Sequence, residues 1–178
     1  ALTSQYTITT RTLTNLTVDY SGAGNQSIFS GTYGALITDG SGTKTFLGNE
    51  TVNGSITIGD GTTLNASSFS TSLSGDWVNN GSFTSSTSTI TFNGNALQNI
   101  IGSVSSSFNN LTINNGNTSM ALNSSQIING TLTLTSGKLA IGAYTLTLNG
   151  AYSGSATNSL TGGSTSNLTT IGTTGTLY

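Results

Sequence analysis

The sequence predicts an all-β protein, specifically a parallel β-solenoid (β-helix) built from coils of about 20 residues. Short runs alternate an aliphatic residue with Thr, as in Leu111-Thr112-Ile113, which is typical of a half-buried strand. Asn and Gly separate these runs, and both residues tolerate the backbone of tight turns. Similar strands recur at Ile113, Leu132 and Tyr152. This spacing fits one coil of a β-helix, in which each coil stacks on the previous one.

An internal duplication supports a single repetitive domain over residues 1–178. Residues 34–78 resemble residues 109–152, so that Ile56 aligns with Leu132. A later slip by a single position aligns Trp77 with Tyr152. A long self-similarity of this kind indicates a repeat architecture.

The expected strands follow in chain order. The first part contains Tyr6-Thr7-Ile8 and the segment 13–19, and the duplicated parts contain the strands around Ile37, Ile56, Ile113 and Leu132. An inserted unit over 76–94 carries strands near Trp77 and Ile90, and the tail carries weaker strands at Leu160, 168–171 and Leu177. The competing interpretation is a β-sandwich resembling a pilin subunit, because six Asn-Gly pairs would also suit hairpin turns.

Composition excludes several classes of function. The chain has 178 residues, of which 4% are charged and 63 are Ser or Thr, and it contains no Cys and no His. Disulfides and thiolate metal sites are therefore excluded. Three cations cannot neutralise a run of phosphates, so we expect no nucleic-acid partner. No apolar run is long enough to span a membrane.

Without His or Cys the familiar nucleophilic triads are excluded, and we expect neither catalysis nor a cofactor. Asp19, Asp39 and Asp60 follow successive strands at nearly regular intervals and could stack in one row. The favoured interpretation is that they are turn residues. A weak calcium site on that row is the alternative.

Other polar patterns have simple structural interpretations. Asn-X-Ser/Thr sequons make Asn15, Asn53, Asn110 and Asn129 candidates for glycosylation. Five Thr residues between 131 and 147 should face outward, where stacked hydroxyls could order water or bind glycans. The aromatic residues are expected to fill the core. They are Phe69, Trp77, Phe83, Phe92, Tyr144 and Tyr152.

Three segments carry a resemblance to a known repeat type. They are Gly75-Asp76-Trp77-Val78-Asn79-Asn80-Gly81-Ser82-Phe83, Ser88-Thr89-Ile90-Thr91-Phe92-Asn93-Gly94 and Phe108-Asn109-Asn110-Leu111-Thr112-Ile113. The chain resembles, over about residues 12–177, the low-charge β-helical repeats of large secreted surface and adhesin-like proteins, especially of Bacteroidota. The resemblance implies a β-helix and a cell-surface setting, and it leaves the function open.

We therefore expect an extracellular or cell-surface structural protein. It would be the subunit of a self-assembling filament, with itself as partner, or a repeat stalk of an adhesin. Nearly uncharged surfaces repel each other little, and the ends of a solenoid are open strand edges. The strands 2–18 and 168–178 should meet between subunits through Leu13, Leu16, Val18, Leu168, Ile171 and Leu177. The alternative is a binding module, either a surface-glycan-binding adhesin or an ice-binding solenoid.

Overall fold

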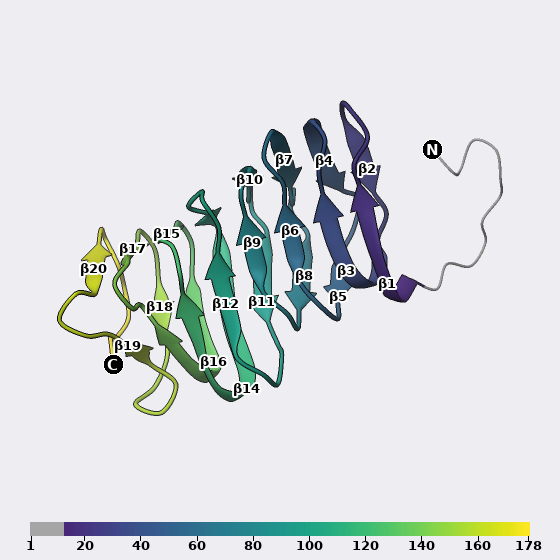
Figure 1. Cartoon of the computed structure of the whole chain (residues 1–178). Coiled ribbons are helices and arrows are strands. Elements are labelled where there is room, and N and C mark those ends of the chain that lie inside the picture. The colour runs from purple at the N-terminus through teal and green to yellow at the C-terminus, as the bar shows by residue number, and fades with distance from the viewer. Residues whose placement is uncertain (1–12) are drawn as a thin grey trace.

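The protein is a stack of coils around one long axis. Its computed structural model describes residues 13–178, apart from the side chains of residues 117 and 118, and contains no helix in that range. Figure 1 shows the strands stacked from the coil of β1 at one end to the coil of β20 at the other. All strand pairs are parallel, and about eight turns make a β-solenoid. The sandwich alternative is wrong, because its hairpins would require antiparallel pairs.

Each coil crosses three faces, which we name after one buried residue on each. The Phe46 face contains two separate sheets of four strands. The first comprises β2 (Gln26–Ile28), β4 (Gly42–Phe46), β7 (Thr62–Asn65) and β10 (Ser82–Thr84). The second comprises β13 (Ser107–Phe108), β15 (Gln126–Ile128), β17 (Thr145–Leu148) and β20 (Asn167–Thr170).

The other two faces share one sheet of twelve strands, because three long strands turn the corner between them. These corner strands are β3 (Gly31–Thr38), β14 (Asn110–Leu122) and β16 (Leu132–Ala140). The Phe92 face adds β5 (Glu50–Val52), β8 (Ser70–Leu73), β11 (Thr89–Phe92) and β18 (Tyr152–Ser153). The Trp77 face adds β1 (Leu13–Tyr20), β6 (Ile56–Ile58), β9 (Trp77–Asn79), β12 (Gln98–Ile101) and β19 (Leu160–Thr161).

The register confirms the predicted coil length, since stacked strands lie about 20 residues apart in the sequence. On the Trp77 face, Leu36 pairs with Ile56, and Ile56 pairs in turn with Trp77. On the Phe92 face, Val52 pairs with Leu73 in the same way. Each coil therefore places its inward residues directly over those of the coil before it.

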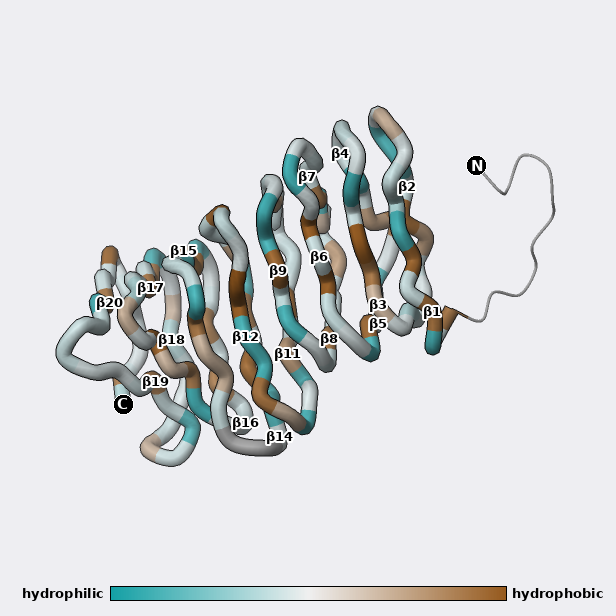
Figure 2. The backbone as a smooth tube through the Cα atoms, in the orientation of Figure 1, coloured by the Kyte–Doolittle hydropathy of each residue, from teal (hydrophilic) through white to brown (hydrophobic). Residues whose placement is uncertain are grey.

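The core is a continuous column of aliphatic and aromatic side chains inside the three faces. Inward residues such as Leu36, Ile56 and Leu111 have no exposed surface, while the Thr residues between them lie partly exposed outside. Figure 2 shows this as short brown segments that recur along the strands of successive coils. Each fully buried aliphatic side chain contributes about 1.5–3 kcal/mol, so the column holds the stack together.

Three aromatic rings fill the core where the Phe46 face is interrupted. No strand pairing joins β10 to β13, so this face is split between residues 84 and 107. The rings of Trp77 and Phe83 lie 4.7 Å apart and nearly perpendicular, and Phe108 lies 5.4 Å from Trp77 and 5.6 Å from Phe83. Aromatic packing thus spans a gap that strand pairing leaves open.

The internal duplication does not superpose on the coils. Ile37 points outward on the Trp77 face and is partly exposed, whereas its sequence match Ile113 is buried on the Phe92 face. The aligned segments share a strand pattern but occupy different faces. The structural repeat is the single coil, because stacking needs only that inward residues recur once per turn.

Candidate functional site

The N-terminal end of the described solenoid is an open strand edge. Strand β1 pairs only with β3, and β2 pairs only with β4, so the outer side of each lacks a neighbour among residues 13–178. Leu13 and Val18 pack partly against the core, while Leu16 is 53% exposed. These are three of the residues predicted to mediate assembly. Residues 2–12 of the predicted edge lie outside the described residues.

The C-terminal end is also open, and it is more apolar. Strand β20 pairs only with β17 within the described range, and a single bridge from Ala151 to Thr174 continues the Phe92 face. The three predicted assembly residues at this end, Leu168, Ile171 and Leu177, are 37%, 62% and 42% exposed. The structure therefore places the two predicted sets at opposite ends of the rod, where neither set can contact the other within one chain (Figure 1).

The predicted row of Asp residues does not form. Asp19 lies opposite Ile37, but Asp39 comes two positions after Ile37, and Asp60 is displaced by one further position relative to Asp39. All three are exposed, and Asp39 Oδ1 accepts a hydrogen bond from the Gly40 N–H at 2.7 Å, as a turn residue does. Residues 13–178 contain no group of three or more acidic or His side chains that could hold a metal ion.

The four sequon asparagines differ in accessibility. Asn15, Asn53 and Asn129 are exposed, and Asn110 is partly buried. The Asn53 amide donates to the Thr14 carbonyl at 3.0 Å, and the Asn110 amide donates to Thr89 Oγ1 at 3.4 Å while its oxygen accepts from the Thr131 N–H. Of these four, Asn110 is therefore the least accessible to a modifying enzyme.

A continuous ladder of hydroxyl groups runs along the outside of the Phe92 face. Each member lies directly opposite the next in the strand register. Its members are Thr32, Thr51, Ser72, Thr91, Thr112, Thr133 and Ser153. We expected one outward Thr surface over residues 131–147, but Thr133 lies on this face and Thr147 on the Phe46 face. The missed signal was the recurrence of Thr or Ser at one position of every coil.

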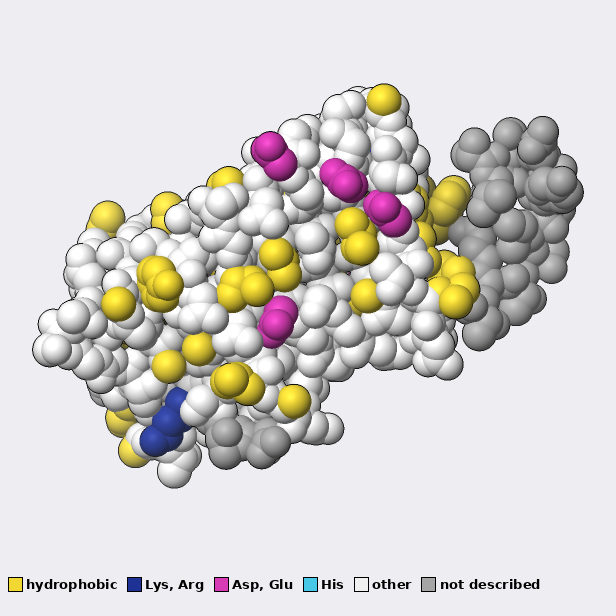
Figure 3. Space-filling model, viewed as in Figure 1, with side chains coloured by type: hydrophobic (Ala, Val, Ile, Leu, Met, Phe, Trp, Pro, Cys, Tyr) yellow, Lys and Arg dark blue, Asp and Glu magenta, His cyan; other side chains and the backbone are white. Residues whose placement is uncertain are grey.

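The surface is nearly uncharged. On the face seen in Figure 3 white atoms predominate, hydrophobic side chains form separate patches, and acidic and basic side chains are few. Lys138 on β16 is the only exposed cation among residues 13–178. Such a surface offers little long-range repulsion between copies of the chain.

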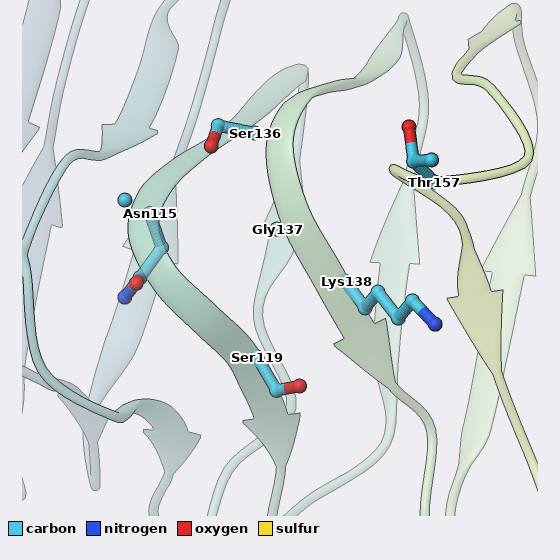
Figure 4. Close-up of a pocket in the computed structure, with 7 residues that line it drawn as sticks. Asn115, Ser119, Ser136, Gly137, Lys138 and Thr157 are labelled. Carbon is cyan, nitrogen blue, oxygen red and sulfur yellow. The ribbon is translucent and has the colours of Figure 1, made fainter.

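Lys138 lines a shallow pocket of about 400 Å³ beside the corner strands. Ser119 on β14 lies opposite Lys138, and Thr157 precedes β19 (Figure 4). The remaining lining residues are Asn115, Gly116, Ser136 and Gly137. The pocket therefore presents one exposed ammonium group among hydroxyl and amide groups.

Two charged side chains, which we did not expect to be buried, lie in the core near the N-terminal end. Lys44 has no exposed surface, and its Nζ donates to the carbonyls of Gly22, Gly24 and Ser41 at 2.5, 2.9 and 2.9 Å. Glu50 is 3% exposed. The sequence did contain a signal for both, because residues two positions apart in a strand face the same side. Lys44 lies two positions before buried Phe46, and Glu50 lies two positions before buried Val52.

Only one of the two carboxyl oxygens of Glu50 accepts a hydrogen bond within residues 13–178. Its Oε2 accepts a hydrogen bond from the Gly31 N–H at 2.9 Å, and its Oε1 has no hydrogen-bond partner within residues 13–178. Burial away from water raises the pKa of Glu50 to about 8, and the Gly31 hydrogen bond offsets only part of that rise.

The aromatic residues mostly confirm the expected core role. Trp77, Phe92 and Tyr152 are buried, and Phe69 and Phe83 pack partly against the core. Tyr144 is the exception, with 37% of its surface exposed.

Within the described part of the chain, no helix has the length and apolar character needed to cross a membrane. Comparison of the chain with family models, with curated proteins and with solved structures found no match.

Proposed function

We propose that this chain is a non-catalytic structural protein of the cell surface or extracellular space. It acts as the subunit of a self-assembling filament or as the repeat stalk of a surface adhesin. The observation that carries the proposal is the pair of open ends. Strands β1 and β20 each pair on one side only within residues 13–178, and exposed apolar residues accompany both.

Open parallel edges favour end-to-end stacking for two physical reasons. An unpaired edge presents backbone N–H and C=O groups that another coil can satisfy in the same register as the coils within the chain. Stacking also removes Ile171 and Leu177 from water, at about 25 cal/mol for each Å² of apolar surface. With 4% charged residues in the chain, little electrostatic repulsion opposes this contact.

Negative-stain electron microscopy of the purified chain tests the proposal. A filament should show a subunit repeat of roughly 38 Å, from about eight turns at about 4.8 Å each. Ile171→Lys should abolish filaments because it places a charge at the C-terminal contact. Leu97→Lys is a matched control, since Leu97 is 64% exposed but lies at the side of the rod, before β12.

Two outcomes would contradict the filament proposal. Rods of one subunit length at all concentrations would leave only the stalk or a binding module. Filaments that tolerate Ile171→Lys and lose order with Leu97→Lys would mean that subunits associate through their sides.

A binding module is the second candidate, favoured by the hydroxyl ladder of the Phe92 face. Its members repeat at the coil spacing of about 4.8 Å, and a flat, regular hydroxyl array can match ordered water or an extended glycan. Thr91→Tyr would interrupt the middle of the ladder, whereas Thr63→Tyr on the Phe46 face is the control. Loss of binding to crystalline cellulose, or of ice-growth inhibition, only in Thr91→Tyr would support this candidate.

A further inference from the structure

The outside of the Trp77 face carries aliphatic side chains at positions where the Phe92 face carries hydroxyl groups. Four partly exposed residues lie directly opposite one another in the strand register, and we call them the outer row: Ile37, Thr57, Val78 and Ile101. The face seen in Figure 3 includes β6, β9 and β12, and hydrophobic side chains lie over them. The outer row is therefore a largely apolar line along the side of the rod.

The outward side chains of this face become smaller toward the C-terminal end. Ala121 on β14 lies opposite Ala140 on β16, and both point outward because their strand neighbours are buried. The bulky members of the outer row lie on β3, β9 and β12, nearer the N-terminal end. Two copies lying antiparallel would set the bulky half of one face over the alanine half of the other, as close packing between two sheets requires.

The charges on this side of the rod are divided between the same two halves. Asp19 lies opposite Ile37 at the N-terminal end of the outer row, and Asp39 and Asp60 follow the ends of β3 and β6. The one exposed cation of the described chain, Lys138, lies on β16 in the other half. A parallel pair would set the two copies of Asp19 against each other. An antiparallel pair instead sets each acidic half against the half that holds Lys138, which is favourable.

The face is also large enough for a stable contact. Each outward position covers roughly 32 Å², from a coil spacing of about 4.8 Å and two residues of about 3.3 Å each. With about three such positions on each of eight strands, the face covers roughly 750 Å² in one copy. Two fully overlapped copies would bury about 1,500 Å², which is within the usual range of specific protein interfaces.

We propose that a second copy of this chain binds antiparallel along the Trp77 face, with a two-fold axis between β9 and β12. Four of the eight strands of the face lie on each side of this axis. The axis sets Val78 of each copy over Ile101 of the other, and the same patch serves both copies, as in any symmetric dimer. This contact joins the sides of two rods, whereas the proposed filament joins their ends, so either can fail while the other stands.

Analytical ultracentrifugation of Ile171→Lys tests the pairing, because this substitution removes the end-to-end contact of the proposed filament. The variant should form a dimer that dissociates on dilution. Adding Val78→Lys or Ile101→Lys should leave only monomer, because either change buries two unpaired charges near the two-fold axis. Thr63→Lys is the matched control, since it adds the same charge at a partly exposed position on the outside of the Phe46 face. Circular dichroism checks that every variant keeps the fold.

The same comparison applies if Ile171→Lys still forms filaments, which would contradict the end contact alone. Paired filaments should then become single in Val78→Lys and stay paired in Thr63→Lys, as seen by negative-stain electron microscopy.

Charge reversal and salt test the antiparallel orientation. Lys138→Glu should weaken the dimer several-fold, because it replaces an attraction between the opposed halves by a repulsion. Adding Asp39→Lys and Asp60→Lys should restore the affinity. Higher salt should weaken the dimer that retains all three residues, because salt screens the attraction.

Three results would overturn the inference. Ile171→Lys that is monomeric at every concentration means that the face binds no second copy. A dimer that survives both Val78→Lys and Ile101→Lys means that the rods pair through another face. A dimer that resists Lys138→Glu and tightens with added salt means that the rods lie parallel.

Discussion

Trp77 Nε1 donates a hydrogen bond to Ser106 Oγ at 2.9 Å, and this bond joins β9 of the twelve-stranded sheet to the start of the second sheet of the Phe46 face. Ser106 immediately precedes β13, the first strand beyond the interruption of the Phe46 face. Its hydroxyl also accepts from Asn79 Nδ2 at 3.0 Å, and its backbone N–H donates to Gln126 Oε1 at 2.9 Å. A buried polar network therefore accompanies the aromatic packing across the gap.

Ser106→Ala should destabilise the chain by about 1–3 kcal/mol, because Trp77 Nε1 and Asn79 Nδ2 would both be left buried without an acceptor. Urea denaturation followed by Trp77 fluorescence measures the change. Ser103→Ala is the control, since Ser103 is exposed and lies in the same connection. Equal stability of the two variants would mean that water replaces the lost hydroxyl.

Gly102→Ala should be among the most damaging single substitutions, costing about 3 kcal/mol or more. Gly102 has a φ of 127°, and a Cβ there would overlap the Asn79 carbonyl oxygen of the neighbouring coil. Gly163→Ala is the control, because a Cβ at Gly163 meets nothing within 4 Å. Thermal unfolding by circular dichroism compares the two. A similar melting temperature for both would show that the coil at Gly102 shifts at little cost.

Lys44→Met should loosen the first turn without unfolding the solenoid. Met fills a similar apolar volume but cannot bind the carbonyls of Gly22, Gly24 and Ser41. All three residues are exposed, so water can reach those carbonyls. Amide hydrogen exchange should accelerate between residues 22 and 28 and stay unchanged beyond β12. Faster exchange throughout would mean that Lys44 supports the whole stack.

Glu50→Gln should make stability less dependent on pH. The pKa of Glu50 is about 8 in the folded chain and 4.5 in the unfolded chain, so the folded state binds the extra proton between these values. The stability of the unchanged protein is therefore greatest below pH 4.5 and decreases up to pH 8, by at most about 1.4 kcal/mol per pH unit. Urea denaturation from pH 5 to 9 measures the slope. Equal slopes in the unchanged protein and in Glu50→Gln would contradict this account of Glu50.

The coil length and the inward positions could be predicted from the sequence, because stacking requires aliphatic residues once per turn at a fixed parity. Leu132 and Leu134 illustrate this, with Thr133 outside between them. The assignment of each strand to a face could not be predicted from the sequence, since the alternating pattern of aliphatic and polar residues is the same on all three faces. Ile37 and Ile113 therefore look equivalent in sequence while one is outside and the other inside.

The buried charges were harder to predict for a different reason. Glu50 and Lys44 occupy inward positions, but a charged residue is ordinarily assigned to the surface because burial removes it from water. Only the folded chain brings the carbonyls of Gly22 and Gly24 to Lys44, and the Gly31 N–H to Glu50. The split of the Phe46 face likewise depends on how residues 85–106 pass around the other two faces.

The interrupted Phe46 face has a mechanical consequence. In a stack of coils the backbone hydrogen bonds run along the rod axis, so a pulling force loads each coil boundary in series. Most boundaries carry bonds on three faces, whereas the boundary between β10 and β13 has no strand pairing on one of them. Under tension the rod should part there first, between the coil that contains β10 and the coil that contains β13.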